Sequence, residues 1–208
     1  MLKIFGLFLY LVIIGGGCNM TEAVSNVGAV EQSKDEPILK KIAEHAAKNF
    51  SLSSGNISVK EVSLKDLPSG VRQFYVTEKN VSDGKRYNYL LQENRLYSSG
   101  VDADFGRFLK DNNFLGRKEL DAKWFQTILW KLNDFSNQLL IDDEKISKPA
   151  ENLKPFSGKI SAPSLSRTDS GAVYKFYTQS VTVRPVQKFE ITVPADYQVK
   201  FDREMVTP

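Results

Sequence analysis

The sequence predicts an α+β protein, with antiparallel β-sheet packed by two main helices. Two observations indicate this class. In two segments, which begin near residues 36 and 122, apolar residues recur every three to four positions, as on one face of an α-helix. Elsewhere in the body they alternate every second position, in short runs bounded by turn-forming residues, as in β-strands. The predicted order is helix, about four strands, helix and about four strands.

The first helix has recognisable start signals. Asp35 is a candidate N-cap, and Pro37 suits the first turn. The apolar side chains that follow have helical spacing: Ile38, Leu39, Ile42, Ala46 and Phe50. The opposite face is charged, so we expect one side of this helix to pack on the sheet.

Four short segments after this helix show the two-residue period of β-strands. They are residues 57–59, 71–77, 86–92 and 95–97. Residues that tolerate tight turns separate them, at positions 68–70, 80–84 and 93–94. Short turns between successive strands predict an antiparallel meander.

The second main helix carries the larger apolar side chains. Around residues 102–113 the pattern is irregular, and we expect a short helix there that contains Phe105 and Phe108. Asp121 is then the candidate N-cap of the main helix. A wide apolar stripe follows: Trp124, Phe125, Ile128, Leu129, Leu132, Phe135 and Leu139. Side chains of this size predict that the helix lies at the centre of the core.

Residues 141–163 contain three prolines and mix acidic with basic side chains, which predicts an exposed connection. A hairpin turn is expected at residues 168–171, where the sequence reads Thr-Asp-Ser-Gly. Strand patterns return around this turn, at residues 164–167, 172–178, 181–184, 188–193 and 197–201.

Each half of the body, a helix with a meander, resembles the cystatin-like arrangement in its order of elements. The resemblance implies that the body could be a duplicated α+β unit, with halves 35–115 and 116–208. The glutamine-x-valine-x-glycine loop through which cystatins inhibit proteases is missing from the sequence, so protease inhibition is not implied. One larger antiparallel sheet packed by two helices explains the same pattern equally well.

An N-terminal apolar run ends at the only cysteine of the chain. Residues 4–14 are apolar, Lys3 precedes them, and three glycines lead to Cys18. This layout resembles bacterial lipoprotein precursors. The resemblance implies that Cys18 is acylated and becomes the first residue of the mature chain. The predicted cleavage before Cys18 divides the chain into a signal peptide (1–17), a lipidated cysteine with a flexible tether (18–34) and the α+β body (35–208).

The lipid bilayer, through acylated Cys18, is therefore the first predicted partner. Two or three acyl chains give stable attachment, where one does not. Asn19, in place of the aspartate that retains enteric lipoproteins in the inner membrane, implies by resemblance the outer membrane of the cell envelope. The alternative is an ordinary secretory signal, which would leave an unanchored secreted protein. The apolar run is shorter than the about 20 residues that a membrane-spanning helix needs.

Composition argues against several classes of function. The 28 basic and 25 acidic residues nearly balance, which argues against a nucleic-acid binder. With one histidine, His45, and one cysteine, the usual nucleophile and zinc constellations are incomplete, so we expect no catalytic residues, metal or cofactor. The acidic residues at 142–144, and Asp102 with Asp104, lack the spacing of a calcium loop. They leave a carboxylate-dependent extracytoplasmic enzyme as the alternative to a non-catalytic binding or structural lipoprotein.

Aromatic and arginine side chains on the predicted strands are candidates for a binding surface. Tyrosine and arginine are enriched at recognition surfaces because they combine contact area with hydrogen-bond donors. The alternative is that the tyrosines line the core with their hydroxyl groups at its edge. Such a surface would bind an envelope protein or a surface ligand. The candidates on strands are Arg86, Tyr87, Tyr89, Arg95 and Tyr97, and Trp130 on the second main helix is a further candidate.

Overall fold

The computed structural model describes residues 35–62, 67–79, 85–133, 135, 137–180 and 185–208. Within these ranges the chain forms helices and two antiparallel sheets of four and five strands, which confirms the predicted α+β class. The signal peptide, Cys18 and the tether lie outside the described residues, as does the strand predicted at 181–184. Among the residues it does describe, no helix is both long and apolar enough to cross a membrane.

The first sheet is the predicted meander. Its strands lie in the order β1-β2-β3-β4, and each pair of neighbours is antiparallel. The elements of this part are α1 (Glu36–Phe50), the 3-10 turn η1 (Ser54–Asn56), β1 (Ile57–Val62), β2 (Val71–Glu78), β3 (Tyr87–Gln92) and β4 (Arg95–Ser98). The turn between β3 and β4 is tight because Glu93 adopts a left-handed conformation, with φ of 53°.

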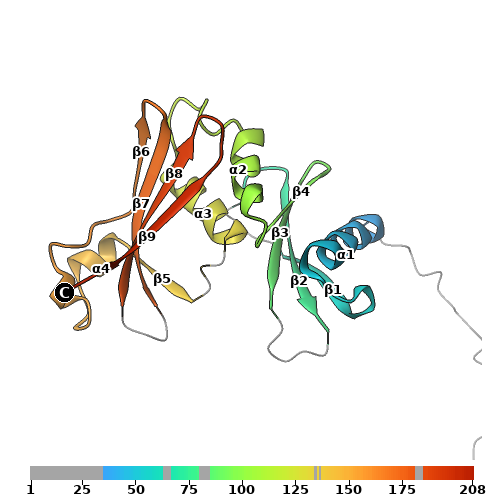
Figure 1. Ribbon diagram of the computed structural model, residues 1–208, viewed down its shortest axis with the longest axis horizontal. Helices are drawn as coiled ribbons and strands as arrows, with labels where there is room; N and C mark the ends of the chain where they lie inside the picture. Colours follow the sequence, from blue (N-terminus) through green and yellow to red (C-terminus); the bar gives the residue numbers. More distant parts are fainter. Residues whose placement is uncertain (1–34, 63–66, 80–84, 134, 136, 181–184) are drawn as a thin grey trace, which may run out of the picture. The chain divides into compact units, whose positions relative to one another are not determined.

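Helix α1 lies across one face of this sheet (Figure 1). Ile42 and Ala46 are fully buried and pack with Phe74 and Val76 of β2. Asp35 stands at the N-cap position as predicted, but its side chain makes no capping hydrogen bond. Its carboxylate instead lies 2.9 Å from Arg72, because that guanidinium, which also binds Glu61, offers a charged partner.

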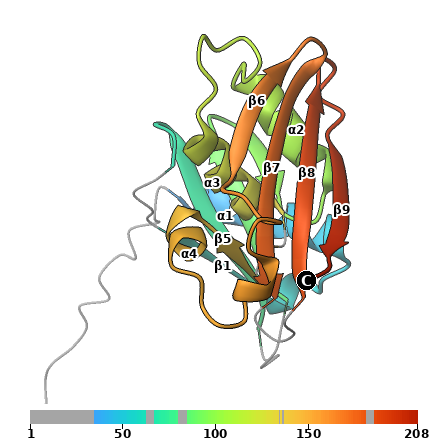
Figure 2. The same cartoon turned by 90° about the vertical axis from the view of Figure 1, so that its left-hand side faces the viewer.

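The second sheet has the order β5-β7-β8-β9, and β6 pairs with the same edge of β7 as β5 does (Figure 2). The hairpin predicted at 168–171 is confirmed, since Thr168 pairs with Gly171. A Cβ at Gly171 would lie 2.0 Å from the carbonyl oxygen of Val193, so only glycine fits. The elements are α2 (Asp102–Asp111), α3 (Ala122–Leu132), β5 (Gln138–Ile141), α4 (Asp143–Ser147), the 3-10 turn η2 (Lys154–Phe156), β6 (Ser164–Thr168), β7 (Gly171–Ser180), β8 (Val186–Pro194) and β9 (Lys200–Val206).

Helix α3 ends earlier than its apolar stripe predicts. Asn133 ends the helix in an extended conformation, and its side-chain amide donates to the carbonyl of Leu129 at 3.1 Å. Phe135 lies beyond the helix but still enters the core, where its ring packs 5.6 Å from that of Phe176. Leu139 lies on β5. Leu139 is exposed there, so of these two residues only Phe135 contributes to the core.

Two further boundaries differ from the prediction. The last strand begins at Lys200 rather than at residue 197, because Tyr197 has a left-handed φ of 62° and lies in a turn. The connection predicted at 141–163 is more than exposed chain, since it contains α4 and η2. Its apolar residues form a small buried cluster with Val186, made of Ile141, Leu153 and Phe156.

The main core joins the two predicted halves. Helices α2 and α3 lie between the two sheets (Figure 1). The core contains Leu90 and Tyr97 from the first sheet together with Tyr174 and Ile191 from the second. One of the two expected arrangements was a single continuous sheet packed by the helices, and the structure has two sheets instead. The other arrangement, duplication of an α+β unit, stays a prediction.

Candidate functional site

A groove of about 540 Å³ opens between α1, the start of β4 and α2. We call it the cationic groove. It is lined by Lys41, His45, Asn94, Arg95, Leu96, Arg107, Lys110 and Asp111. Among these described lining residues, four are lysine or arginine and one, Asp111, is a carboxylate. The groove therefore carries a net positive charge.

Local structure explains why these side chains share a surface. Lys41 and His45 are four residues apart on α1, and Arg107, Lys110 and Asp111 are three and four apart on α2, so each set occupies one helical face. The Nζ atom of Lys41 donates to the carbonyl oxygen of Asn94 at 2.8 Å. This bond connects α1 to the β3–β4 turn and brings the first helix to the edge of the groove.

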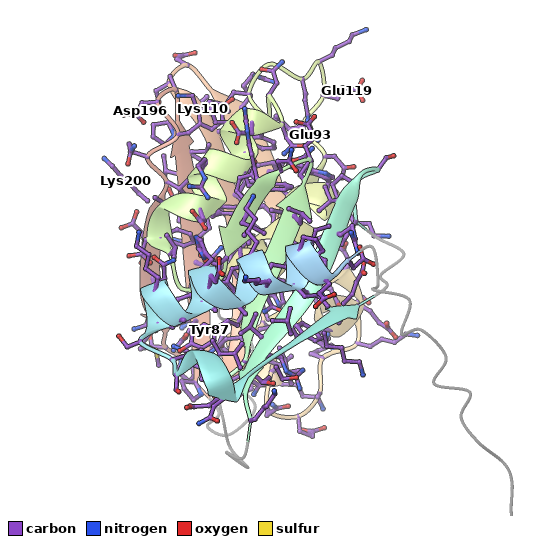
Figure 3. All side chains as sticks on the ribbon, turned by 90° about the vertical axis from the view of Figure 1, so that its right-hand side faces the viewer. Tyr87, Glu93, Lys110, Glu119, Asp196 and Lys200 are labelled. Carbon is purple, nitrogen blue, oxygen red and sulfur yellow. The ribbon has the colours of Figure 1, made fainter. Side chains whose placement is uncertain are left out.

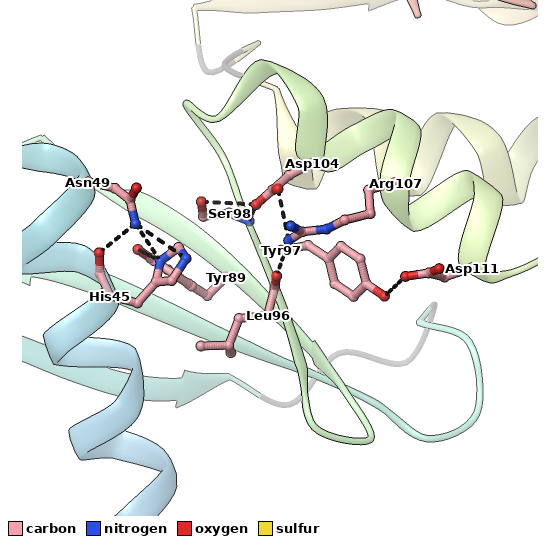
Figure 4. A network of polar contacts seen from close by, with 9 residues as sticks. All are labelled: His45, Asn49, Tyr89, Leu96, Tyr97, Ser98, Asp104, Arg107 and Asp111. Carbon is pink, nitrogen blue, oxygen red and sulfur yellow. Dashed lines mark hydrogen bonds and ion pairs between the residues drawn. The ribbon is translucent and has the colours of Figure 1, made fainter. Parts of the chain in front are cut away.

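Arg107 is held in place by a buried acid (Figure 4). One of its guanidinium nitrogens lies 2.9 Å from Asp104 Oδ1 and also donates to the carbonyl of Leu96. The Asp104 side chain is 2 % exposed, whereas that of Arg107 is 51 % exposed. The guanidinium also lies over the ring of Tyr97, 5.1 Å from its centre. Arg107 is therefore fixed in orientation and still open to a ligand.

Asp111, the carboxylate of the groove, is engaged through both oxygens. Oδ1 lies 2.8 Å from Arg95, and Oδ2 accepts a 2.7 Å hydrogen bond from the Tyr97 hydroxyl. Partial burial works to raise the pKa of Asp111, but the bonds from Tyr97 and Arg95 outweigh it and hold the pKa below its ordinary value. The Arg95 side chain remains 61 % exposed. Asp111 thus positions Arg95 without closing it off.

Lys110 is the free cation of the groove. It is exposed, and its side chain makes no hydrogen bond or ion pair with any residue that the structure describes. Figure 3 shows it on α2, on the side of the molecule where α1 crosses the first sheet. Its place in the last turn of α2 is favourable because the helix C-terminus carries partial negative charge.

His45 forms the α1 side of the groove and is half-buried. Its Nδ1 lies 3.1 Å from the hydroxyl of Tyr89, and Asn49 lies at similar distances (Figure 4). Burial lowers the pKa of His45; nearby Arg107 and other cations add to this effect, and Asp104 opposes it. The ring is therefore neutral at pH 7 and takes its place in the groove as a hydrogen-bonded wall.

The predicted binding residues do not form one surface. Arg95 alone lines the cationic groove, and Tyr97 supports it from the buried side. Tyr89 is fully buried, and Tyr87 stacks on Phe50 at 3.9 Å between ring centres. The remaining two pack elsewhere: Arg86 lies over the ring of Tyr75, and Trp130 packs against Phe135 and Phe176. Cys18 lies outside the described residues.

Sequence reasoning missed Lys41, Arg107, Lys110 and Asp111. The only signal was the repeat of basic residues at helical spacing on α1 and α2. That pattern is ordinary for a solvated helix face.

Two of the carboxylates considered for an enzyme, Asp142 and Asp104, have structural partners. Asp142 accepts from the backbone N–H of Lys145 at 3.0 Å and so caps α4. Asp104 binds Ser98 and Arg107. Within the described ranges, no group of three or more histidine, cysteine or acidic residues could hold a metal ion.

A second groove, of about 310 Å³, lies over β8 and β9 and contains three carboxylates among its described lining residues. Glu190 is 3.0 Å from Lys175, and Glu204 is 2.8 Å from Lys188. Because these two acids are paired with lysines, the groove offers a weaker basis for acid–base chemistry than its composition implies.

No protein-family model matches the chain, and comparisons with curated proteins and with solved structures find no match.

Proposed function

We propose that the protein is a lipid-anchored binding protein of the cell envelope, whose body binds an anionic ligand in the cationic groove. The anchor rests on the apolar run and glycines before Cys18. The binding activity rests on one observation. Four basic side chains from three separate elements line a single groove, and its described carboxylate, Asp111, is already paired.

The arrangement favours binding over catalysis. Arg107 and Arg95 are each oriented by a carboxylate and remain more than half exposed, so they are prepared to donate to an anion. His45 is neutral and hydrogen-bonded to the buried Tyr89 and to Asn49. Its described hydrogen-bond partners therefore include no serine, threonine or cysteine that it could activate as a nucleophile. The oriented arginines and the exposed Lys110 supply affinity for an anion, and the described lining residues include no serine, threonine or cysteine that could act as a nucleophile.

The anchor is tested by expressing the full-length chain in a bacterium beside Cys18→Ser. We expect a mature mass that begins at residue 18 with added acyl chains, and partition into the detergent phase. Cys18→Ser should lose both. An unmodified soluble wild-type product, cut at another site, would contradict the anchor and favour the secreted alternative.

The binding activity is tested on the chain from residue 19 onward, which lacks acyl chains and keeps the compact unit of residues 34–208. We expect small dianions to protect this protein against thermal unfolding, since a ligand that binds only the folded state stabilises it. Lys110→Gln should weaken the protection. Equal protection of wild type and Lys110→Gln would place the anion elsewhere.

A further inference from the structure

We propose that the ligand of the cationic groove carries a phosphomonoester group, an inference that rests on the proposed function and specifies its ligand class. Charge is the first argument. Arg95 is paired with Asp111 and Arg107 with the buried Asp104, so the groove keeps a net charge of about two from Lys41 and Lys110, which have no carboxylate partner among the described residues. A phosphomonoester carries −1.5 to −2 charge near pH 7 and three acceptor oxygens, whereas one carboxylate carries −1.

The mixture of donors is the second argument. Arg107 presents a planar guanidinium whose orientation is fixed by Asp104 and the carbonyl of Leu96. Lys110 adds a mobile ammonium from the same helical face. Guanidinium groups match the oxygens of a phosphoryl group in pairs, and lysine adds a point charge. The two side chains are three residues apart on α2, so one phosphoryl group can receive both.

The size of the groove is the third argument. A volume of about 540 Å³ is in the range of sites for small organic ligands and exceeds what a bare phosphate ion fills. Asn94, Leu96 and the neutral ring of His45 line the remainder with amide, apolar and imidazole surface. We therefore expect the phosphoryl group to be attached to a polar organic group, such as a sugar or glycerol.

Calorimetric titration of the chain from residue 19 onward tests this ligand class. The probes are glycerol 3-phosphate, inorganic phosphate and succinate, a dicarboxylate of similar charge. We expect glycerol 3-phosphate to bind more tightly than succinate. Lys110→Gln should weaken this binding about fivefold, the loss of one charged contact at an exposed site. Lys110 makes no hydrogen bond or ion pair with a described residue, so this variant breaks no such bond within the described fold.

Lys175→Gln is the matched control. It removes the same charge from the outer face of the second sheet, where Lys175 pairs with Glu190. Its affinity for glycerol 3-phosphate should equal that of the wild type. An equal loss in both variants would mean that net charge alone is measured, and would overturn the proposed site.

Vesicles distinguish the two sources of this chemistry. Phosphatidic acid exposes the same phosphomonoester on an acylated glycerol, so we would measure sedimentation of the same protein with phosphatidylcholine vesicles that contain phosphatidic acid. Binding to these vesicles that Lys110→Gln weakens would identify a lipid headgroup. Binding of the soluble ester without vesicle binding would identify a soluble phosphorylated ligand.

Failure of this inference can be told apart from failure of the proposed function. Equal affinity for succinate and glycerol 3-phosphate, both sensitive to Lys110→Gln, would overturn phosphoryl recognition and leave an anion-binding groove. Absence of binding by every probe would overturn both. The lipid anchor is tested separately, because the titrated chain lacks Cys18.

Discussion

The backbone N–H of Ser98 donates a 2.7 Å hydrogen bond to Asp104 Oδ2, six residues further along the chain (Figure 4). Both residues are buried. The bond connects the end of β4 to the first turn of α2, and the same carboxylate holds Arg107 through its other oxygen. One acid therefore joins the first turn of α2 to the end of β4 and positions a cation of the groove.

Asp104→Ala should lower the free energy of unfolding by about 2 kcal/mol, because the buried N–H of Ser98 loses its acceptor. Urea unfolding measures this loss. Asp102→Ala, an exposed acid of the same turn, is the control and should cost about 0.5 kcal/mol. Equal losses in the two variants would show that the hydrogen bond from Ser98 to Asp104 makes no measurable contribution to the free energy of unfolding.

Tyr97→Phe should destabilise the protein by about 1–2 kcal/mol at neutral pH, because Asp111 loses a hydrogen bond to its charged form. The pKa of Asp111 in the folded protein lies below its ordinary value. Asp111 therefore stabilises the folded state fully when the pH is above that ordinary pKa, and this stabilisation is lost as the pH falls through the folded-state pKa. The variant should weaken this dependence. Urea unfolding of both proteins from neutral to acidic pH measures it, and a constant difference would contradict this role for Tyr97.

His45 should also make the free energy of unfolding depend on pH, but here the folded state disfavours the charged form, whereas at Asp111 it favours the charged form. Burial lowers the pKa of its ring, which faces Lys41 and Lys48 on its own helix, Tyr89 on β3, and Asp104 and Arg107 on α2. The unfolded chain therefore binds the proton at higher pH, and the free energy of unfolding should fall as the pH drops below about 6.5.

His45→Gln should remove this slope. No other histidine is present in the chain, so no other side chain ordinarily titrates between about pH 7.5 and 5.5. Urea unfolding at these two pH values measures it. The same slope in wild type and variant would assign the effect to another group.

Gly106→Ala should force extra atoms into a packed site, which usually costs about 1–3 kcal/mol. A Cβ there would lie 2.1 Å from the carbonyl oxygen of Tyr197, whose hydroxyl accepts from the backbone N–H of Leu115. This cost should exceed the about 1 kcal/mol that alanine's helix propensity adds, so the free energy of unfolding should fall by up to about 2 kcal/mol.

Gly55→Ala is the matched control, because nothing lies within 4 Å of a Cβ at Gly55. It should be neutral, or stabilise by a few tenths of a kcal/mol. Thermal unfolding compares the two variants. Stabilisation by Gly106→Ala would show that the turn at Tyr197 yields easily and does not clamp α2.

Local pattern predicted most elements because the period of apolar residues is a property of the chain itself. The meander, the first helix and the hairpin at Gly171 followed from spacing and turn residues. The prediction was wrong where apolar residues keep helical spacing although the chain has already left the helix. Phe135 and Leu139 continue the stripe of α3, yet Asn133 ends the helix with its own side chain.

The candidate site was predicted only through Arg95. Lys41 lies far from Arg107 and Lys110 in the chain, and nothing local distinguishes these three from the other basic residues of exposed helix faces. Tyr89 and Tyr97 illustrate the converse. Tyrosine is a residue type that is common at recognition surfaces, but the packing of α1 and α2 on opposite faces of the sheet buries both side chains.

The sequence by itself determined the α+β class, the order of the main helices and of most strands, though not β5 or α4, and the N-terminal pattern that predicts lipidation of Cys18. These depend on spacing, turn residues and composition, which are local. Tertiary structure decided that α2 and α3 lie between two sheets, that Asp104 is buried beneath Arg107, and that four cations meet in one groove. Such meetings depend on strand order and on which faces bury the most apolar surface, and no local pattern specifies either.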